Sequence, residues 1–212
     1  VASFYALTNL HPGSGNSLSY VDLPVQREKH TSFPVIVGSS VKGVIREYAS
    51  RRWNDVEKVT SFFGTEDTGD ISSKISFTDA RILLYPVRSV RGIFAYVTCP
   101  YVLKRFFNDI EVLTNVSDKV KNIISLLNIS DDKVIIDKEL SELKIDNTLV
   151  GIEEFLFSID TEYEIRIIID ELQNCLNIDK KSLSNRLLIV SDSVFTDLVN
   201  YAIEVRTRNK ID

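Results

Sequence analysis

The chain has 212 residues, of which 44% are hydrophobic and 26% are charged, enough for one large domain or a core with an inserted subdomain. No apolar run approaches the roughly 20 residues of a membrane-spanning helix, and the first residues lack the pattern of a signal peptide. We therefore expect a cytoplasmic protein with no membrane partner. Cys99 and Cys175 lie far apart and form no zinc-site spacing with the histidines, so reduced thiols are expected.

The net charge of −5 conceals a strong segregation of charge along the chain. Residues 1–108 carry 13 Lys and Arg against 9 Asp and Glu, whereas residues 109–180 carry 7 against 17. A basic first half suits a surface that binds phosphates. The alternative interpretation is a chance asymmetry of solvated surface charges.

Residue patterns predict a series of short strands and helices. Apolar runs bounded by Gly and Pro predict strands over residues 1–8, 33–37, 75–85, 93–98, 134–136, 155–159, 186–190 and 202–208. Apolar residues at helical spacing predict helices over residues 41–52, 100–107, 117–127, 163–176 and from a cap at 191 or 192 to about 200. Residues 62–73, with two glycines, are predicted to be a loop.

Residues 109–180 differ from the rest of the chain because they are acidic, contain no proline and hold one of the eight glycines. We interpret them as an inserted, mainly helical subdomain, and residues 1–108 and 181–212 as the core. Without the insertion the element order is strand, helix, strand, strand, helix, strand, with additions. This order predicts the α+β class and a ferredoxin-like core related to RNA-recognition folds.

The helix predicted over residues 41–52 starts with a Gly-Ser-Ser sequence at Gly38, Ser39 and Ser40. One of the serines is expected to cap the helix, and the free amides and helix dipole favour an anion there. Lys42 and Arg46 are four residues apart and share a helix face, so they could follow successive phosphates. An ordinary capped helix with a solvated basic face is the alternative. The sequence S-x-x-K at 39–42 lacks the accompanying motifs of penicillin-binding enzymes.

Two further residues in the first part of the chain could take part in chemistry. Asp22 lies in an extended loop, where a carboxylate near phosphates can hold a hard cation such as Mg²⁺ or help deprotonate a ribose 2′-OH. A turn-forming Asp that binds local amides is the alternative. His11 is either a structural hydrogen-bonding residue or a second acid/base group. Asp79 and Arg81 are expected on one strand face, as an ion pair or with Arg81 reaching RNA.

Several of these segments, in this order, resemble the backbone-subunit family of the Cmr (type III-B) CRISPR effectors, which belongs to the RAMP superfamily. The matching segments are residues 11–15 (HPGSG), 21–28 (VDLPVQRE), 33–46, 76–81 (SFTDAR), 85–89 (YPVRS), 94–100 (FAYVTCP) and 188–192 (LIVSD). The resemblance covers about residues 3–107 and 186–208. The VDLP element favours this family over its type III-A counterpart.

The resemblance implies a palm with an RNA-recognition-like fold, whose copies stack into a helical filament along a guide RNA with other Cmr subunits. Target RNA would be cleaved at regular intervals with a weakly bound divalent metal, Mg²⁺ or Mn²⁺. Asp22 matches the family's cleavage residue, which we also assign as the metal ligand, and His11 matches a loop histidine near the scissile position. The residues assigned to RNA binding are Gly38, Ser39, Ser40, Lys42, Arg46, Arg27 and Arg88.

The leading hypothesis is therefore an endoribonuclease subunit that binds guide RNA and cleaves paired target RNA, with Asp22 essential. A second hypothesis is a non-catalytic RNA-binding structural subunit of a type III CRISPR filament, in which Lys42 and Arg46 matter and Asp22 does not. A third is a guide-processing nuclease of the same superfamily that uses other catalytic groups.

Overall fold

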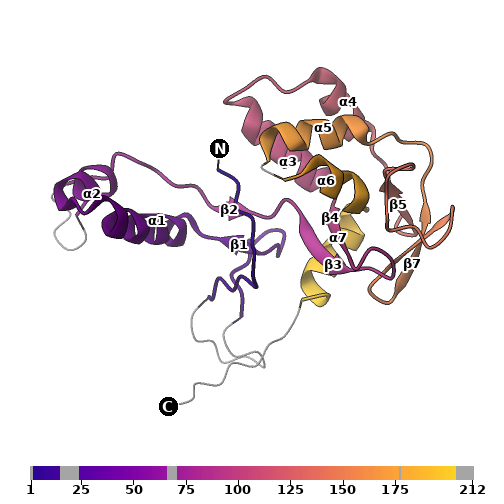
Figure 1. The fold of residues 1–212 in the computed structure, drawn as a ribbon, viewed down its shortest axis with the longest axis horizontal. Coiled ribbons are helices and arrows are strands. Elements are labelled where there is room, and N and C mark those ends of the chain that lie inside the picture. The colour runs from indigo at the N-terminus through magenta and orange to yellow at the C-terminus, as the bar shows by residue number, and fades with distance from the viewer. Residues whose placement is uncertain (1, 15–23, 66–70, 177, 204–212) are drawn as a thin grey trace, which may run out of the picture. The chain divides into compact units, whose positions relative to one another are not determined.

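The computed structural model describes residues 2–14, 24–65, 71–176 and 178–203. The chain forms two compact units, Phe4–Arg81 and Ile82–Asp212, the second together with Val1–Ser3 (Figure 1). Within the described ranges no helix combines the length and the apolar character that crossing a bilayer requires. The division into a palm of residues 1–108 and 181–212 and an insertion of residues 109–180 stays a prediction.

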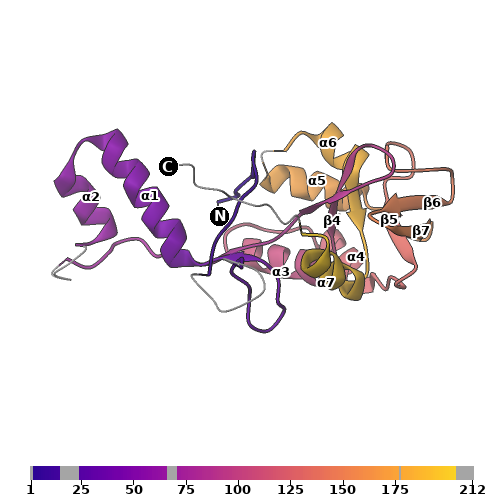
Figure 2. The ribbon, with the colours of Figure 1, turned by 90° about the horizontal axis from the view of Figure 1, so that it is seen from below.

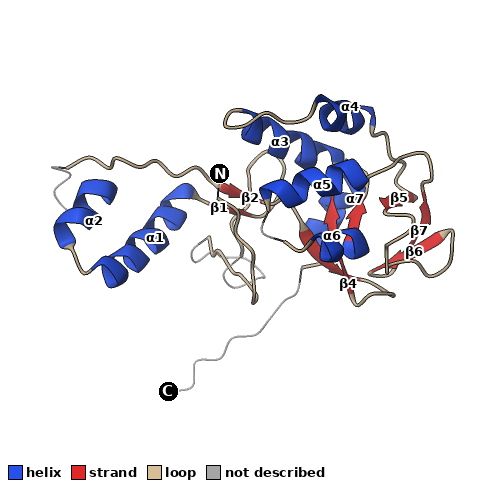
Figure 3. Ribbon diagram, turned by 45° about the horizontal axis from the view of Figure 1, so that its top comes forward, coloured by secondary structure: helices blue, strands red, loops and turns tan. Residues whose placement is uncertain are grey.

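The described residues of the unit 4–81 form two helices and a small sheet. Strand β1 (Val35–Ile36) pairs antiparallel with β2 (Ala80–Arg81). Helices α1 (Gly38–Trp53) and α2 (Val56–Phe63) form a hairpin (Figure 2). The hairpin packs around a cluster of three buried residues, Ala49, Val59 and Phe63. Much of the rest of this unit is extended loop (Figure 3).

Two predictions for this first unit are wrong, and one helix was not predicted. Residues 2–8 form no strand and their side chains are exposed, because an apolar alternation becomes a strand only when a partner pairs with it. Helix α2 was not expected, although Asp55 caps it by accepting a hydrogen bond from the Lys58 N–H at 2.9 Å. The strand predicted over residues 75–85 is reduced to β2 and the first residue of the next strand.

The unit of residues 82–203 is built on a six-stranded sheet in the order β3-β4-β8-β5-β7-β6. Its strands are β3 (Tyr85–Arg88), β4 (Phe94–Thr98), β5 (Lys133–Ile136), β6 (Leu149–Ile152), β7 (Phe155–Ile159) and β8 (Leu187–Ile189). The β4–β8 and β5–β7 pairs are parallel, and the other pairs are antiparallel. Strand β5, from the acidic segment, therefore pairs directly with β8.

The described residues of this unit also form five helices. They are α3 (Pro100–Glu111), α4 (Asp118–Leu126), α5 (Arg166–Cys175), α6 (Lys180–Arg186) and α7 (Asp192–Tyr201). Buried residues from α3, α4, α5 and α6 pack with β4, β5 and β8 in one large apolar core. All of these helices except α6 were predicted, and the α+β class is confirmed.

Candidate functional site

Helix α1 begins at Gly38, and its cap is not the one that the sequence predicts. Neither Ser39 nor Ser40 caps it; instead the Gly38 N–H donates a hydrogen bond to Asp79 Oδ1 at 2.8 Å. A Cβ at Gly38 would lie 2.3 Å from the Phe77 carbonyl oxygen, so only glycine lets this segment pass so closely. The negatively charged group at the start of α1 is therefore the carboxylate of Asp79, which lies 41 residues after Gly38 in the sequence.

The side chains that follow Gly38 differ in how far they are available to a ligand. Ser39 and Ser40 are exposed, whereas Lys42 and Arg46 are half-buried. Arg46 Nη1 donates to the Gly64 carbonyl oxygen at 2.8 Å, at the end of α2. Arg46 therefore helps to hold the α1–α2 hairpin, and Ser39 and Ser40 are the most exposed of these four side chains.

The two ends of the segment that carries Asp22 are joined by hydrogen bonds. Ser14 donates to the Pro24 carbonyl oxygen through its backbone N–H at 2.9 Å and through its hydroxyl at 3.0 Å. The Gln26 N–H donates to the Pro12 carbonyl oxygen at 2.7 Å. Asp22 lies outside the described residues, two positions before Pro24 in the sequence. Hydrogen bonds therefore join the described residues on either side of this segment, Pro12 and Ser14 to Pro24 and Gln26.

His11 and Arg27 belong to the same unit as the start of α1. His11 is exposed, and a Cβ at Gly13 would lie 3.5 Å from the His11 Cε1 atom. Arg27 Nη1 donates to the Ser32 carbonyl oxygen at 2.7 Å, within a turn in which the Thr31 hydroxyl donates to Glu28 at 2.5 Å. The Arg27 guanidinium therefore braces this turn.

Asp79 and Arg81 do not act as the ion pair that the sequence suggests. The Asp79 carboxylate caps α1, and Arg81 Nε lies 3.9 Å from Glu28 Oε1. The Glu28 side chain is only 7% exposed, whereas that of Arg81 is 46% exposed.

Arg88 belongs to the other unit, at the end of β3. Its guanidinium lies 2.5 Å from a Glu154 oxygen and 3.5 Å from a Glu153 oxygen. Two carboxylates of the acidic segment therefore offset its charge. The remaining residues assigned to the site, apart from Asp22, lie in the unit of residues 4–81.

Among residues 2–14, 24–65, 71–176 and 178–203, no group of three His, Cys, Asp or Glu side chains could hold a metal ion. Mg²⁺ commonly binds proteins through one or two carboxylates and keeps several waters. Metal binding by Asp22, which lies outside the described residues, stays a prediction.

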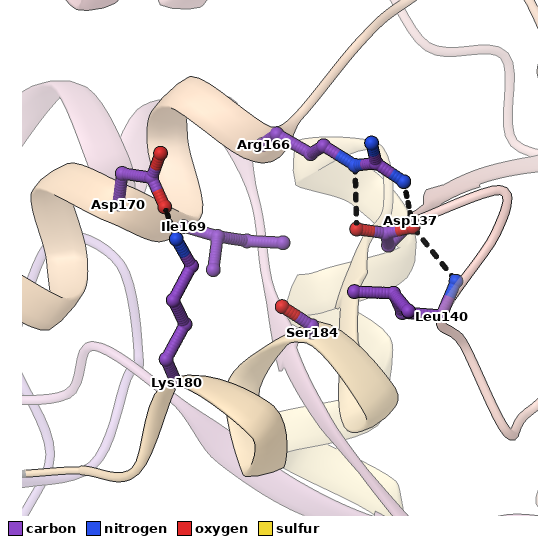
Figure 4. Close-up of a pocket in the computed structure, with 7 residues that line it drawn as sticks. All are labelled: Asp137, Leu140, Arg166, Ile169, Asp170, Lys180 and Ser184. Carbon is purple, nitrogen blue, oxygen red and sulfur yellow. Dashed lines mark hydrogen bonds and ion pairs between the residues drawn. The ribbon is translucent and has the colours of Figure 1, made fainter.

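A cavity of about 200 Å³ lies in the second unit and contains none of the residues assigned to the site (Figure 4). Two ion pairs line it, Asp137 with Arg166 at 3.2 Å and Asp170 with Lys180 at 2.5 Å. Burial alone would raise the pKa of Asp137, but hydrogen bonds from the Leu140 N–H, Arg166 and the Glu139 N–H outweigh it and lower that pKa. The four charged side chains of the cavity wall are therefore paired with one another, beside the apolar Leu140 and Ile169.

The sequence patterns did not point to Gln26, and they suggested the wrong partner for Asp79. Gln26 contacts residues 13 and 11 positions away, and Asp79 contacts one 41 positions away. No local pattern signals such contacts. Only the Gly38 position, between a strand and a helix, hinted at a close backbone approach.

Three comparisons with known proteins place the chain in a family. The RAMP superfamily model matches residues 3–212. The chain is 38% identical to the CRISPR system Cmr endoribonuclease Cmr4 of Pyrococcus furiosus over 218 residues, covering 100% of this chain and 71% of that protein. It is 27% identical to the CRISPR system CMR subunit Cmr4 of Saccharolobus solfataricus, covering 96% and 71%.

A solved structure gives the same result at the level of the fold. The crystal structure of oligomeric Cmr4 from Pyrococcus furiosus superposes with a TM-score of 0.76 and 35% identity, covering 95% of this chain and 72% of that one. The type III-B Cmr-beta complex in its apo state contains a chain with a TM-score of 0.69 and 25% identity. The chain therefore belongs to the RAMP superfamily and, within it, to the Cmr4 family of type III-B CRISPR effector subunits.

Proposed function

We propose that this protein is the endoribonuclease backbone subunit of a type III-B Cmr complex, which binds guide RNA and cleaves paired target RNA. The observation that carries the proposal is the hydrogen-bonded base at Ser14 and Pro24, which closes the segment containing Asp22 within the same unit as the start of α1. A relative at 38% identity bears the name endoribonuclease, which supports the same activity here.

The proposed chemistry is attack of a ribose 2′-OH on its adjacent phosphate. Asp22 removes the hydroxyl proton, the 2′-oxygen bonds to phosphorus, and the bond from phosphorus to the 5′-oxygen breaks. His11, which is exposed, supplies the proton to the departing 5′-oxygen. A divalent cation, Mg²⁺ or Mn²⁺, would neutralise phosphate charge when bound by Asp22. The protein's main contribution is then geometric positioning of the RNA.

Guide RNA is proposed to bind along the first turns of α1. Asp79 already occupies the Gly38 amide, so phosphates would meet the hydroxyls of Ser39 and Ser40 and the ammonium of Lys42. Arg46, Arg27 and Arg88 would add charge while keeping their contacts within the protein. The proposed partners are guide RNA, target RNA, further copies of this chain and other Cmr subunits. The oligomeric form of a relative supports self-assembly.

The decisive experiment is to reconstitute the complex with Asp22→Ala. Target cutting should fall by about 100-fold or more, the contribution typical of a lost acid/base group, while guide binding is unchanged. Asp197→Ala is the matched control, since Asp197 is an exposed aspartate of α7 in the other unit.

Undiminished cutting by the Asp22→Ala complex would contradict the catalytic proposal. With intact guide binding, that result would instead favour the non-catalytic structural subunit. Cleavage of unprocessed repeat RNA by the isolated chain would favour the guide-processing nuclease.

A further inference from the structure

We propose that Gln26 is a positioning residue of the cleavage site, which sets residues 12–13, directly after His11, in register with the start of α1. The inference rests on the proposed function and adds a residue that holds its two parts together. Gln26 itself is not proposed to touch the reacting atoms.

The two ends of the Gln26 carboxamide contact two different segments of the chain. Its Nε2 group donates to the Gly13 carbonyl oxygen at 2.9 Å, and its Oε1 atom accepts from the Val37 N–H at 3.3 Å. Both partners are backbone groups of fixed polarity, so one contact demands a donor and the other an acceptor. Only a carboxamide offers both on one planar group.

The backbone of Gln26 connects the same two segments. Its N–H donates to the Pro12 carbonyl oxygen at 2.7 Å, and its carbonyl oxygen accepts from the Val35 N–H at 3.0 Å. Gln26 therefore makes four hydrogen bonds, two to residues 12–13 and two to residues 35–37. Gln26 therefore links residues 12–13 to residues 35–37.

The two segments lead directly to the two parts of the proposed site. Residues 12–13 follow His11 and begin the segment whose base closes at Ser14 and Pro24. Residues 35–37 directly precede Gly38, the first residue of α1. The Gly38 N–H donates a hydrogen bond to the Asp79 carboxylate. The Gln26 side chain thus holds residues 12–13 at a set position relative to residues 35–37, which lead into the helix proposed to bind the guide.

Removing this side chain should loosen the register without unfolding the segments. The backbone hydrogen bonds of Gln26, and those between Ser14 and Pro24, do not depend on the carboxamide. Reactions that require in-line attack are sensitive to small displacements, and a shift of about 1 Å can cost roughly 100-fold in rate. The effect should therefore appear in the cleavage step and in where the target is cut.

The test uses reconstituted complexes with Gln26→Ala and Gln26→Glu. The glutamate keeps an acceptor for the Val37 N–H but places a second acceptor against the Gly13 carbonyl, so it breaks one arm only. Gln173→Ala and Gln173→Glu are matched controls, because Gln173 is a half-buried glutamine of α5 in the other unit.

We expect both Gln26 variants to lower single-turnover cleavage of saturating target by about 10- to 100-fold, with guide affinity within about twofold of wild type. The cut positions on the target should also spread to neighbouring nucleotides. The Gln173 variants should cut at the wild-type rate and positions.

Wild-type rates and sharp cut positions in both Gln26 variants would overturn the inference. Parallel loss of guide binding and cutting would also overturn it, by assigning Gln26 to folding alone. Failure of the proposed function is seen separately: if Asp22→Ala cuts normally while the Gln26 variants cut slowly, Gln26 positions RNA for another group. If the wild-type complex does not cut, both proposals fail.

Discussion

The two units of the molecule are stabilised in different ways. The unit of residues 82–203 has a large apolar core drawn from four helices and three strands. In the described part of the unit of residues 4–81, a small cluster of three buried residues lies between α1 and α2, and hydrogen bonds hold the loops through Gln26, Ser14 and Asp79. Most residues of the proposed site lie in this unit. Hydrogen bonds are directional, so they define the relative positions of the atoms that they join.

The largest expected effect is a difference in unfolding free energy between core substitutions in the two units. Phe107→Ala, in the large core, should lower the free energy of unfolding by about 3–5 kcal/mol because it leaves a cavity among buried neighbours. Phe63→Ala should cost about 3 kcal/mol or less, since its small cluster can collapse or admit water. Denaturant unfolding, with amide hydrogen exchange to assign each loss to a unit, measures both. Equal losses would contradict the contrast.

A smaller effect tests the close packing at the start of α1. Gly38→Ala places a Cβ 2.3 Å from the Phe77 carbonyl oxygen and should destabilise the unit of residues 4–81 by about 1–3 kcal/mol. Gly43→Ala is the matched control in the same helix, because no atom lies within 4 Å of its added Cβ. It should stabilise the protein by about 0.5–1 kcal/mol through helix propensity. Thermal unfolding of both variants checks the opposite signs; a neutral Gly38→Ala would refute the packing role.

The smallest expected effect is the dependence of folding stability on pH through Asp137, in the unit of residues 82–203. The pKa of Asp137 is lower in the folded protein than its usual value of about 3.9, so its ionised form stabilises the fold above that value. This contribution is lost as the pH falls through the folded pKa. Asp137→Asn should remove it, so the stability difference between wild type and variant should shrink from about pH 6 to about pH 3. A difference that is constant over this range in denaturant titrations would rule out the role of Asp137.

Elements with strong local signals could be predicted from the amino-acid sequence. Pro100 lies in the first turn of α3, Ser191 caps α7, and the apolar run of residues 93–98 contains β4. The Ser191 hydroxyl accepts from the Val194 N–H at 3.1 Å, as the capping pattern suggests. Motif order along the chain also indicated the family correctly. The roles of Asp22, His11 and the RNA-binding residues stay predictions.

Contacts between segments that lie far apart in the sequence are visible in the folded structure and not in the sequence. In the structure, Asp79 and not a serine accepts the hydrogen bond from the first amide of α1, and Gly38 allows a close backbone contact there. The Gln26 side chain bonds to the backbone of two different segments. Strands of the acidic segment belong to the same sheet as β8. The physical reason is that periodicity and capping patterns act within a few residues. A hydrogen bond across 41 residues depends on the approach of two backbones, which no local pattern encodes.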